Sequence, residues 1–210
     1  MFPKGTNHDA IKLNISFTYI KMSEVKGYLK IITGPMFSSK TTHALSELTA
    51  LKYAGNRCLY INHAGDVRDE TFSSHFLEKC KLTDITLIKT DNLESLAGCV
   101  AKYDVICVDE SQFFPNLKSI ILNWVETMKK HVILAGLLIK FNREPFGELL
   151  SLIPYADSHE MLTAYCVMCR DKSTKALFTY RKDAYDSDIV IGGEDKYRSI
   201  CRGCYLKNMK

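Results

Sequence analysis

The sequence predicts an α/β fold, in which a mostly parallel sheet carries helices on both faces and a smaller unit follows. Apolar runs of strand length alternate with segments of helical periodicity from Leu29 to about Ala135. Strands connected through helices pair in parallel. The alternation stops near Pro154, and two Cys-x-x-Cys pairs follow it. We therefore expect three parts: an N-terminal extension at 1–27, an α/β domain at 28–157 and a small domain at 158–210.

The expected elements follow from local periodicity, taken in chain order. Strands are predicted at 29–32, 57–61, 85–88, 105–108 and 131–135. Helices with one apolar face are predicted at 42–53, 92–102, 117–129 and 148–153. Residues 72–81 fit neither period clearly, and residues 1–26 show no clean period.

The composition limits the kind of protein this is. The chain has 210 residues and a net charge of +4, from 28 basic and 24 acidic residues. That mild balance suits an enzyme that handles anionic phosphates and gives no sign of nucleic-acid binding. No apolar run reaches membrane-spanning length, and the N-terminus lacks the apolar core of a signal peptide. We expect a cytoplasmic protein with neither a nucleic-acid nor a membrane partner.

The first expected strand leads into a loop that ends in Lys40-Thr41 and is followed by a helix. This is the setting of a phosphate-binding P-loop, whose backbone N–H groups attract phosphate oxygens. Lys40 would reach the β- and γ-phosphates, and the Thr41 hydroxyl would bind Mg²⁺. The alternative is a plain strand–turn–helix with an exposed lysine. The predicted nucleotide-binding residues of the loop are Gly34, Pro35, Met36, Phe37, Ser38, Ser39, Lys40 and Thr41.

One residue departs from the P-loop pattern G-x-x-x-x-G-K-[ST]. The chain has Ser39 where that pattern has its second glycine. If the position needs a positive φ, serine costs about 1–2 kcal/mol more than glycine there.

A second decisive stretch is the apolar run Val105–Val108, which ends in Asp109 and Glu110. A buried strand that ends in a carboxylate beside a P-loop is the Walker B arrangement, which holds Mg²⁺ directly or through water. Because successive strand residues alternate in direction, we expect Glu110 to point away from Asp109, toward an incoming hydroxyl. The alternative is an acidic pair in a solvated turn.

The cysteines fall into two groups. Cys58, Cys80, Cys99 and Cys107 lie among apolar or helical neighbours, and we expect them to be buried free thiols. The other four form pairs of Cys-x-x-Cys spacing, which in an intracellular chain favours a metal over disulfides. Four thiolates suit a tetrahedral, structural Zn²⁺ site in a zinc ribbon. The predicted zinc ligands are Cys166, Cys169, Cys201 and Cys204.

Several motifs, taken together and in order, resemble the type II thymidine kinases of cells and large DNA viruses. The resemblance covers about residues 28–205. It rests on Gly34-Pro-Met-Phe-Ser-Ser-Lys-Thr41, Asp66-Val-Arg68, Asp109-Glu-Ser-Gln-Phe-Phe-Pro115, Phe141-Asn-Arg-Glu-Pro-Phe-Gly147, the two cysteine pairs and Val190-Ile-Gly-Gly-Glu-Asp-Lys-Tyr197.

That resemblance implies a RecA-like P-loop NTPase fold, a zinc ribbon with a lid (lasso) loop, and ATP- and Mg²⁺-dependent phosphorylation of the thymidine 5′-hydroxyl. It implies that Glu110 is the general base, that Asp109 lies on the Mg²⁺ side and that Gln112 positions the site. It also implies that Asp66 and Arg68 reach the phosphates, although Arg68 taken alone reads as a surface charge. The residues that the resemblance places around thymidine are Met36, Phe113, Leu137, Phe141, Phe146, Thr179 and, in the lid, Asp188, Ile189, Val190, Ile191, Gly192 and Tyr197.

The resemblance further implies a homotetramer that thymidine triphosphate inhibits. Three departures from the family pattern stand out: Ser39, Ser111 in place of a usual glycine, and Leu138-Ile-Lys140 in place of Asp-Gly-x. Two other classes of protein stay open on the sequence. One is a nucleotide-binding protein without turnover, which Ser39 favours. The other is an ATPase of the recombinase or helicase kind.

Overall fold

The computed structural model describes residues 26–66, 85–182 and 192–208. Its centre is a six-stranded sheet in the order β3-β2-β4-β5-β1-β6, and every neighbouring pair in it is parallel. The strands of this sheet are β1 (Tyr28–Thr33), β2 (Cys58–His63), β3 (Thr86–Thr90), β4 (Val105–Val108), β5 (His131–Gly136) and β6 (Ser158–Met161).

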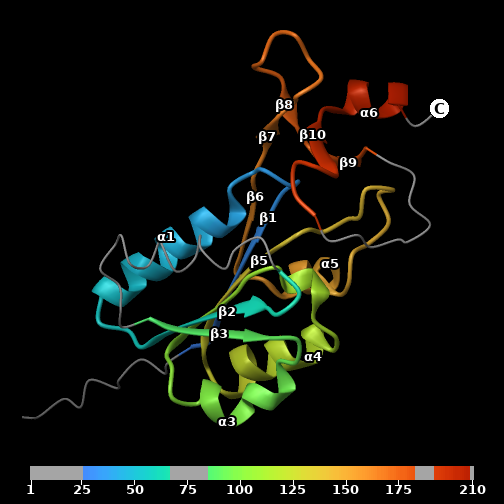
Figure 1. Ribbon diagram of the computed structural model, residues 1–210. Coiled ribbons are helices and arrows are strands. Elements are labelled where there is room, and N and C mark those ends of the chain that lie inside the picture. The colour runs from blue at the N-terminus through green and yellow to red at the C-terminus, as the bar shows by residue number, and fades with distance from the viewer. Residues whose placement is uncertain (1–25, 67–84, 183–191, 209–210) are drawn as a thin grey trace, which may run out of the picture.

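Helices and short helical turns connect the strands (Figure 1). The α-helices beside the sheet are α1 (Lys40–Tyr53), α3 (Ala97–Val100), α4 (Leu117–Leu122) and α5 (Leu149–Leu152). Single 3₁₀ turns form at Glu94–Leu96, Ser111–Phe113 and Ile153–Tyr155, and a π-helical turn forms at Asn123–Thr127.

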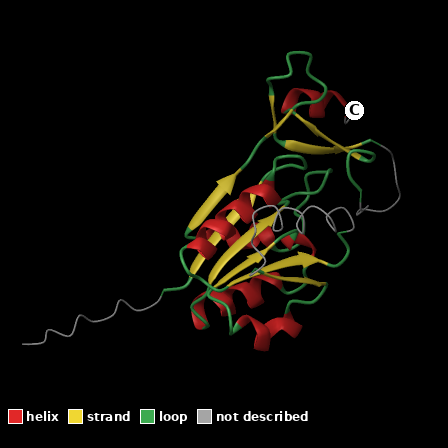
Figure 2. Cartoon of the chain, turned by 60° about the vertical axis from the view of Figure 1, so that its left-hand side comes forward, coloured by secondary structure: helices red, strands yellow, loops and turns green. Residues whose placement is uncertain are grey.

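Helices cover both faces of the sheet, as Figure 2 shows. The strand side chains alternate between two buried apolar clusters, one on each face. One cluster packs α1 through Ala44, Leu45 and Leu48. The other packs α4, the π turn and α5 against the opposite face. Parallel strands covered on both sides place their carboxyl ends at one edge, where ligands of open α/β sheets bind.

A second, smaller unit lies beyond the sheet (Figure 1). It consists of the antiparallel pairs β7 (Ala164–Tyr165) with β8 (Lys175–Ala176) and β9 (Phe178–Arg181) with β10 (Tyr197–Ile200). Helix α6 (Arg202–Asn208) closes the chain's described part. We call this unit, residues 164–208, the ribbon. Its own small core includes Phe178, Ile200 and Tyr205.

The parallel sheet and its flanking helices confirm the predicted fold class, but two helices differ from expectation. The helix expected at 117–129 changes to π geometry after Leu122, where Met128 N–H donates to the Asn123 carbonyl (3.0 Å). The wider turn lets the neighbours Trp124 and Val125 both be buried. The helix expected at 92–102 is a 3₁₀ turn followed by the four-residue α3.

The sixth strand, β6, was not anticipated from the sequence. It follows Pro154 and pairs with β1 at the edge of the main sheet. Its pattern of half-buried and exposed residues differs from the continuous apolar runs of the central strands. The expected division into 1–27, 28–157 and 158–210 stays a prediction.

Several expectations fall outside the described residues. These are the N-terminal extension up to residue 25, the ambiguous segment 72–81, Cys80, Arg68 and the lid residues 188–191. Among the helices of the described ranges, none is long and apolar enough to cross a membrane.

Candidate active site and metal centre

The loop between β1 and α1 has the backbone of an anion-binding turn. Phe37 and Ser39 both have positive φ (64° and 63°), and the loop ends at the N-terminus of α1. Left-handed residues in such a turn aim successive N–H groups into one concavity. The hydroxyl of Ser38 is buried, and among the described residues it has no hydrogen-bond partner. A phosphate oxygen would supply that partner, so the loop fits the group that the sequence predicts.

Gly34 allows the loop to pass close to its neighbours. Its φ is +149°, and a Cβ there would lie 2.6 Å from both the Leu162 carbonyl oxygen and the Ser38 hydroxyl. Lys40 Nζ donates a hydrogen bond to the Pro35 carbonyl (2.9 Å), which places the ammonium group over the loop.

Ser39 occupies the position where the P-loop pattern has glycine. Its backbone is left-handed, a conformation that favours glycine. A residue with a Cβ costs about 1–2 kcal/mol more than glycine in this conformation. Ser39 precedes α1 as its N-cap, yet its side chain makes no capping hydrogen bond. The strain is therefore not offset by a cap.

At the end of β4, Asp109 is a buried carboxylate that three groups support. Its Oδ1 accepts the N–H of Glu110 (2.9 Å), and its Oδ2 accepts the phenol of Tyr60 (2.9 Å). The Thr41 side chain also hydrogen-bonds to it. Burial raises the pKa of Asp109 to about 6 and the Glu110 charge adds to this rise, while these hydrogen bonds lower the pKa.

Asp109 and Thr41 therefore lie together, as the Walker B expectation requires. Both offer oxygen atoms, which are the ligands that Mg²⁺ prefers. The donor set fits that ion.

Glu110 is oriented by a turn and not by strand alternation, which corrects the reasoning from the sequence. Strand β4 ends at Val108, and Glu110 has a left-handed backbone (φ 48°). Its Oε2 accepts a hydrogen bond from Gln112 Nε2 (2.6 Å). Gln112 Oε1 in turn accepts the N–H of Leu137 (2.9 Å), so Gln112 ties Glu110 to the end of β5.

Four of the predicted nucleoside residues contact one another in two pairs. The rings of Phe113 and Phe146 meet edge to face, with centroids 5.1 Å apart. The Met36 N–H donates to Thr179 Oγ1 (3.0 Å), which joins the phosphate loop to β9 of the ribbon. Gly147 lets the Phe146 segment approach, because a Cβ there would lie 2.2 Å from the Gln112 carbonyl oxygen.

Phe37 and Tyr197 line a cavity of about 600 Å³ between the phosphate loop and the ribbon. Neither Glu110, Phe113 nor Phe146 lines it.

Residues 138–146 form a tight loop that the ribbon supports. Tyr205 of α6 donates its hydroxyl to the Phe141 carbonyl (2.8 Å). The Arg181 guanidinium lies over the Phe141 ring, 3.8 Å from its centroid. The backbone of Phe141 is therefore held from the ribbon side.

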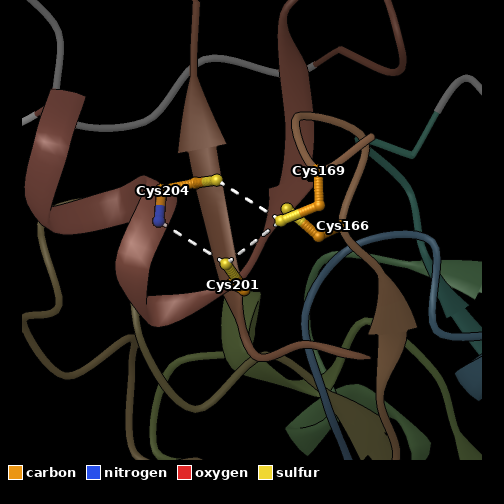
Figure 3. Close-up of side chains that lie close together, drawn as sticks. All are labelled: Cys166, Cys169, Cys201 and Cys204. Atoms are coloured by element: carbon orange, nitrogen blue, oxygen red, sulfur yellow. Dashed lines mark hydrogen bonds between the residues drawn. The ribbon is translucent and has the colours of Figure 1, made fainter. Parts of the chain in front are cut away.

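The four paired cysteines converge in the ribbon (Figure 3). Their sulfur atoms all lie within 4.8 Å of one another, and Cys169 Sγ is 3.7 Å from those of Cys201 and Cys204. A tetrahedral Zn²⁺ with Zn–S bonds of about 2.3 Å separates its sulfurs by about 3.8 Å. The Cys204 N–H also points at Cys201 Sγ (3.5 Å). The cluster has the donors and spacing of a structural zinc site.

Backbone N–H groups also favour the thiolate form of Cys166. Burial raises the pKa of Cys166, but hydrogen bonds from the N–H groups of Cys201, Met168 and Cys169 lower it to about 7. Of the other cysteines, Cys58 and Cys107 are buried free thiols as predicted, whereas Cys99 is only half-buried.

The sequence did not point to Tyr60, His63 or Tyr205. His63 lies against the rings of Phe113 and Phe114, with centroids 5.2 and 5.0 Å away, and burial lowers its pKa. The pairing of β2 with β4 would have indicated Tyr60. Tyr60 lies opposite Cys107 on β4, and Asp109 is the next residue on the same face of the sheet. No local pattern marks Tyr205.

A phosphate loop after the first strand, with a buried carboxylate at the end of another parallel strand of the same sheet, β4, defines a P-loop nucleotide-binding protein. A profile of the thymidine kinase family matches residues 27–205. The cytosolic thymidine kinases of Cricetulus griseus and Homo sapiens are 37% and 36% identical over 189 residues, covering 88% of this chain and 76% of theirs. A thymidine kinase of Choristoneura fumiferana entomopoxvirus is 35% identical over 184 residues, covering 86% of this chain and 97% of its own. This chain therefore belongs to the thymidine kinase family and is a transferase.

Replacing Ser39 by glycine should relieve the strain in the phosphate loop. We expect Ser39→Gly to raise the free energy of unfolding by about 1 kcal/mol, measured by urea denaturation. Ser46→Gly is the matched control, because Ser46 is exposed in the middle of α1 and glycine there should cost about 0.5 kcal/mol. ATP binding should tighten or stay unchanged in Ser39→Gly. If Ser39→Gly destabilises the protein as Ser46→Gly does, the backbone of Ser39 is not strained. If Ser39→Gly loses ATP binding, the Ser39 hydroxyl is itself a phosphate ligand.

The cysteine cluster should hold about one zinc per chain, measured by elemental analysis of the purified protein. Cys201→Ser should lower the zinc content and the melting temperature, because three thiolates close the site poorly. Cys99→Ser serves as the control, since Cys99 is a free cysteine outside the cluster. A zinc-free wild-type protein of unchanged stability would contradict the assignment.

Proposed function

We propose that the protein transfers the γ-phosphoryl group of ATP to the 5′-hydroxyl of thymidine, giving thymidine monophosphate and ADP. The observation that carries this proposal is the convergence of Lys40, Thr41, Asp109 and Glu110 at the carboxyl edge of the sheet. Membership of the thymidine kinase family supplies the substrate class.

In this proposal the loop 34–41 binds the phosphates through its N–H groups, and Lys40 lies on their β/γ side. Asp66 and Arg68, which follow β2 in the sequence, are further proposed phosphate contacts. Thr41 and Asp109 would hold Mg²⁺, which when bound offsets the charge of the phosphates. The buried position of Asp109 supports this role, because a cation beside it would stabilise the negative charge of a carboxylate that is only 1% exposed.

Glu110 is the proposed general base that accepts the proton of the 5′-hydroxyl. Gln112 is its positioning partner, because its amide N–H donates to the Glu110 carboxylate (2.6 Å) while its oxygen is fixed by the N–H of Leu137. Phosphoryl transfer passes through a loose transition state, so orientation and charge contribute more than a strong base.

The nucleoside side of the proposed site is apolar. Met36 and Phe146 are almost buried, and Phe146 meets Phe113 edge to face. Such an apolar wall suits the pyrimidine ring and its 5-methyl group. One methyl group contributes about 1–3 kcal/mol to the discrimination between two substrates. The other proposed contacts are Leu137, Phe141, Thr179, Gly192, Tyr197 and the lid residues 188–191.

We further propose a cytoplasmic homotetramer that thymidine triphosphate inhibits. The cytosolic thymidine kinases among its relatives support the location. The outer edge of β6 supports assembly, because no strand of the described ranges pairs with it and its last residue, Met161, is exposed. Thymidine triphosphate carries both a thymine and a triphosphate, so it would occupy both subsites. Sedimentation velocity with and without this nucleotide tests the assembly, and a monomer in both would refute it.

The activity is tested with purified protein, ATP, Mg²⁺ and thymidine, with thymidine monophosphate as the measured product. Glu110→Gln should lower kcat by about 10²–10⁴, the usual share of general-base catalysis, and leave ATP binding unchanged. The matched control is Glu126→Gln, because Glu126 is exposed in the π turn.

Two outcomes would count against the proposal. A wild-type protein that hydrolyses ATP and forms no thymidine monophosphate would exclude the kinase activity. A Glu110→Gln variant within about threefold of wild-type kcat would exclude Glu110 as the base.

A further inference from the structure

Tyr60 is a buried phenol that the proposed mechanism does not use. It lies in the middle of β2 and is 0% exposed, in the cluster that packs the sheet against α1. The other buried members of this cluster are apolar, among them Ala44 on α1 and Cys107 on β4. A hydroxyl in such surroundings is costly unless it makes a hydrogen bond.

The register of the sheet aims this hydroxyl at Asp109. Tyr60 pairs with Cys107 across the parallel strands β2 and β4, and Asp109 is two residues further along. Residues two apart point to the same face of a sheet, so Asp109 follows Cys107 onto the α1 face. The Tyr60 hydroxyl donates to Asp109 Oδ2 over 2.9 Å. No loop takes part in this alignment, which lies wholly within rigid strands and the residue after β4.

The two oxygens of Asp109 are thereby held by different donors. Oδ1 is held by the Glu110 N–H and Oδ2 by Tyr60, each at 2.9 Å. With both oxygens bonded, the carboxylate plane cannot turn without breaking a bond. Each carboxylate oxygen accepts more than one hydrogen bond, so lone pairs remain for a cation or its water.

We propose that Tyr60 is a positioning residue that orients the Asp109 carboxylate for Mg²⁺, an inference that rests on the proposed kinase function. A ligand fixed in one orientation before binding loses little entropy when the cation arrives. Tyr60 touches neither nucleoside nor phosphate in this assignment, and it acts only through Asp109. It should therefore affect the affinity for the metal and leave that for thymidine unchanged.

The test uses Tyr60→Phe, which removes the hydroxyl and keeps the ring in the core. Mn²⁺ is the probe, titrated by electron paramagnetic resonance against the protein with a non-hydrolysable ATP analogue. We expect the dissociation constant for Mn²⁺ to rise about tenfold, as for a lost hydrogen bond to a charged group. The KM for thymidine should stay within about twofold, and kcat should recover as Mg²⁺ is raised.

Tyr103→Phe is the matched control, because its hydroxyl donates to Thr86 Oγ1 (2.9 Å) away from Asp109. It should leave the Mn²⁺ constant unchanged. In an Asp109→Asn background, Tyr60→Phe should change Mn²⁺ binding by less than about twofold, because its effect passes through the carboxylate. Tyr60→Met, which also lacks the hydroxyl, carries the same expectation if the phenylalanine variant does not fold.

Three results would overturn the inference. The first is a Mn²⁺ dissociation constant of Tyr60→Phe within about twofold of wild type, and the second is a loss of Mn²⁺ affinity in the Asp109→Asn background equal to that in the wild-type background. The third is a rise in the KM for thymidine as large as the rise in the Mn²⁺ dissociation constant. The last would mean a general loss of structure. A wild-type protein that makes no thymidine monophosphate and binds no Mn²⁺ with the nucleotide would instead refute the proposed kinase function.

Discussion

A carboxylate buried to 1% exposure is stable only where donors surround it, and Asp109 draws its donors from three separate parts of the chain. Thr41 comes from the start of α1, Tyr60 from β2, and the N–H of Glu110 from the turn after β4. The phosphate loop, the neighbouring strand and the turn that carries Glu110 therefore share one charged group. The Asp109 carboxylate thus holds these three segments next to one another. The apolar packing of α1 on the sheet stabilises this arrangement.

The ribbon contributes to the same edge of the sheet from outside. Its four cysteines bring β7–β10 and α6 into one small unit whose core is too limited to be stable alone. Tyr205 then contacts the Phe141 carbonyl, and Arg181 covers the Phe141 ring. A zinc ion held by these cysteines would stabilise the ribbon and, through Tyr205 of α6, the position of the loop that carries Phe141.

Much of this could be predicted from the sequence, and the limits have physical causes. The central strands were predicted within one or two residues, because strands buried on both faces are continuous apolar runs. The P-loop and the cysteine cluster were found because their chemistry requires fixed spacings. Strand β6 was missed, since an edge strand with exposed residues has no such run. Tyr60 and Tyr205 act across the fold, at distances in sequence that no local pattern covers.

The hydrogen bond from the Met36 N–H to Thr179 Oγ1 makes the phosphate loop and the ribbon one thermodynamic system. A ligand that draws β9 toward the sheet also changes the free energy of the loop that carries Met36. By linkage, any effect of a ribbon ligand on the affinity of the loop for its own ligand is matched by an equal effect in the other direction. Two substrates bound on either side of this bond would be coupled to the extent that either of them strains or releases it.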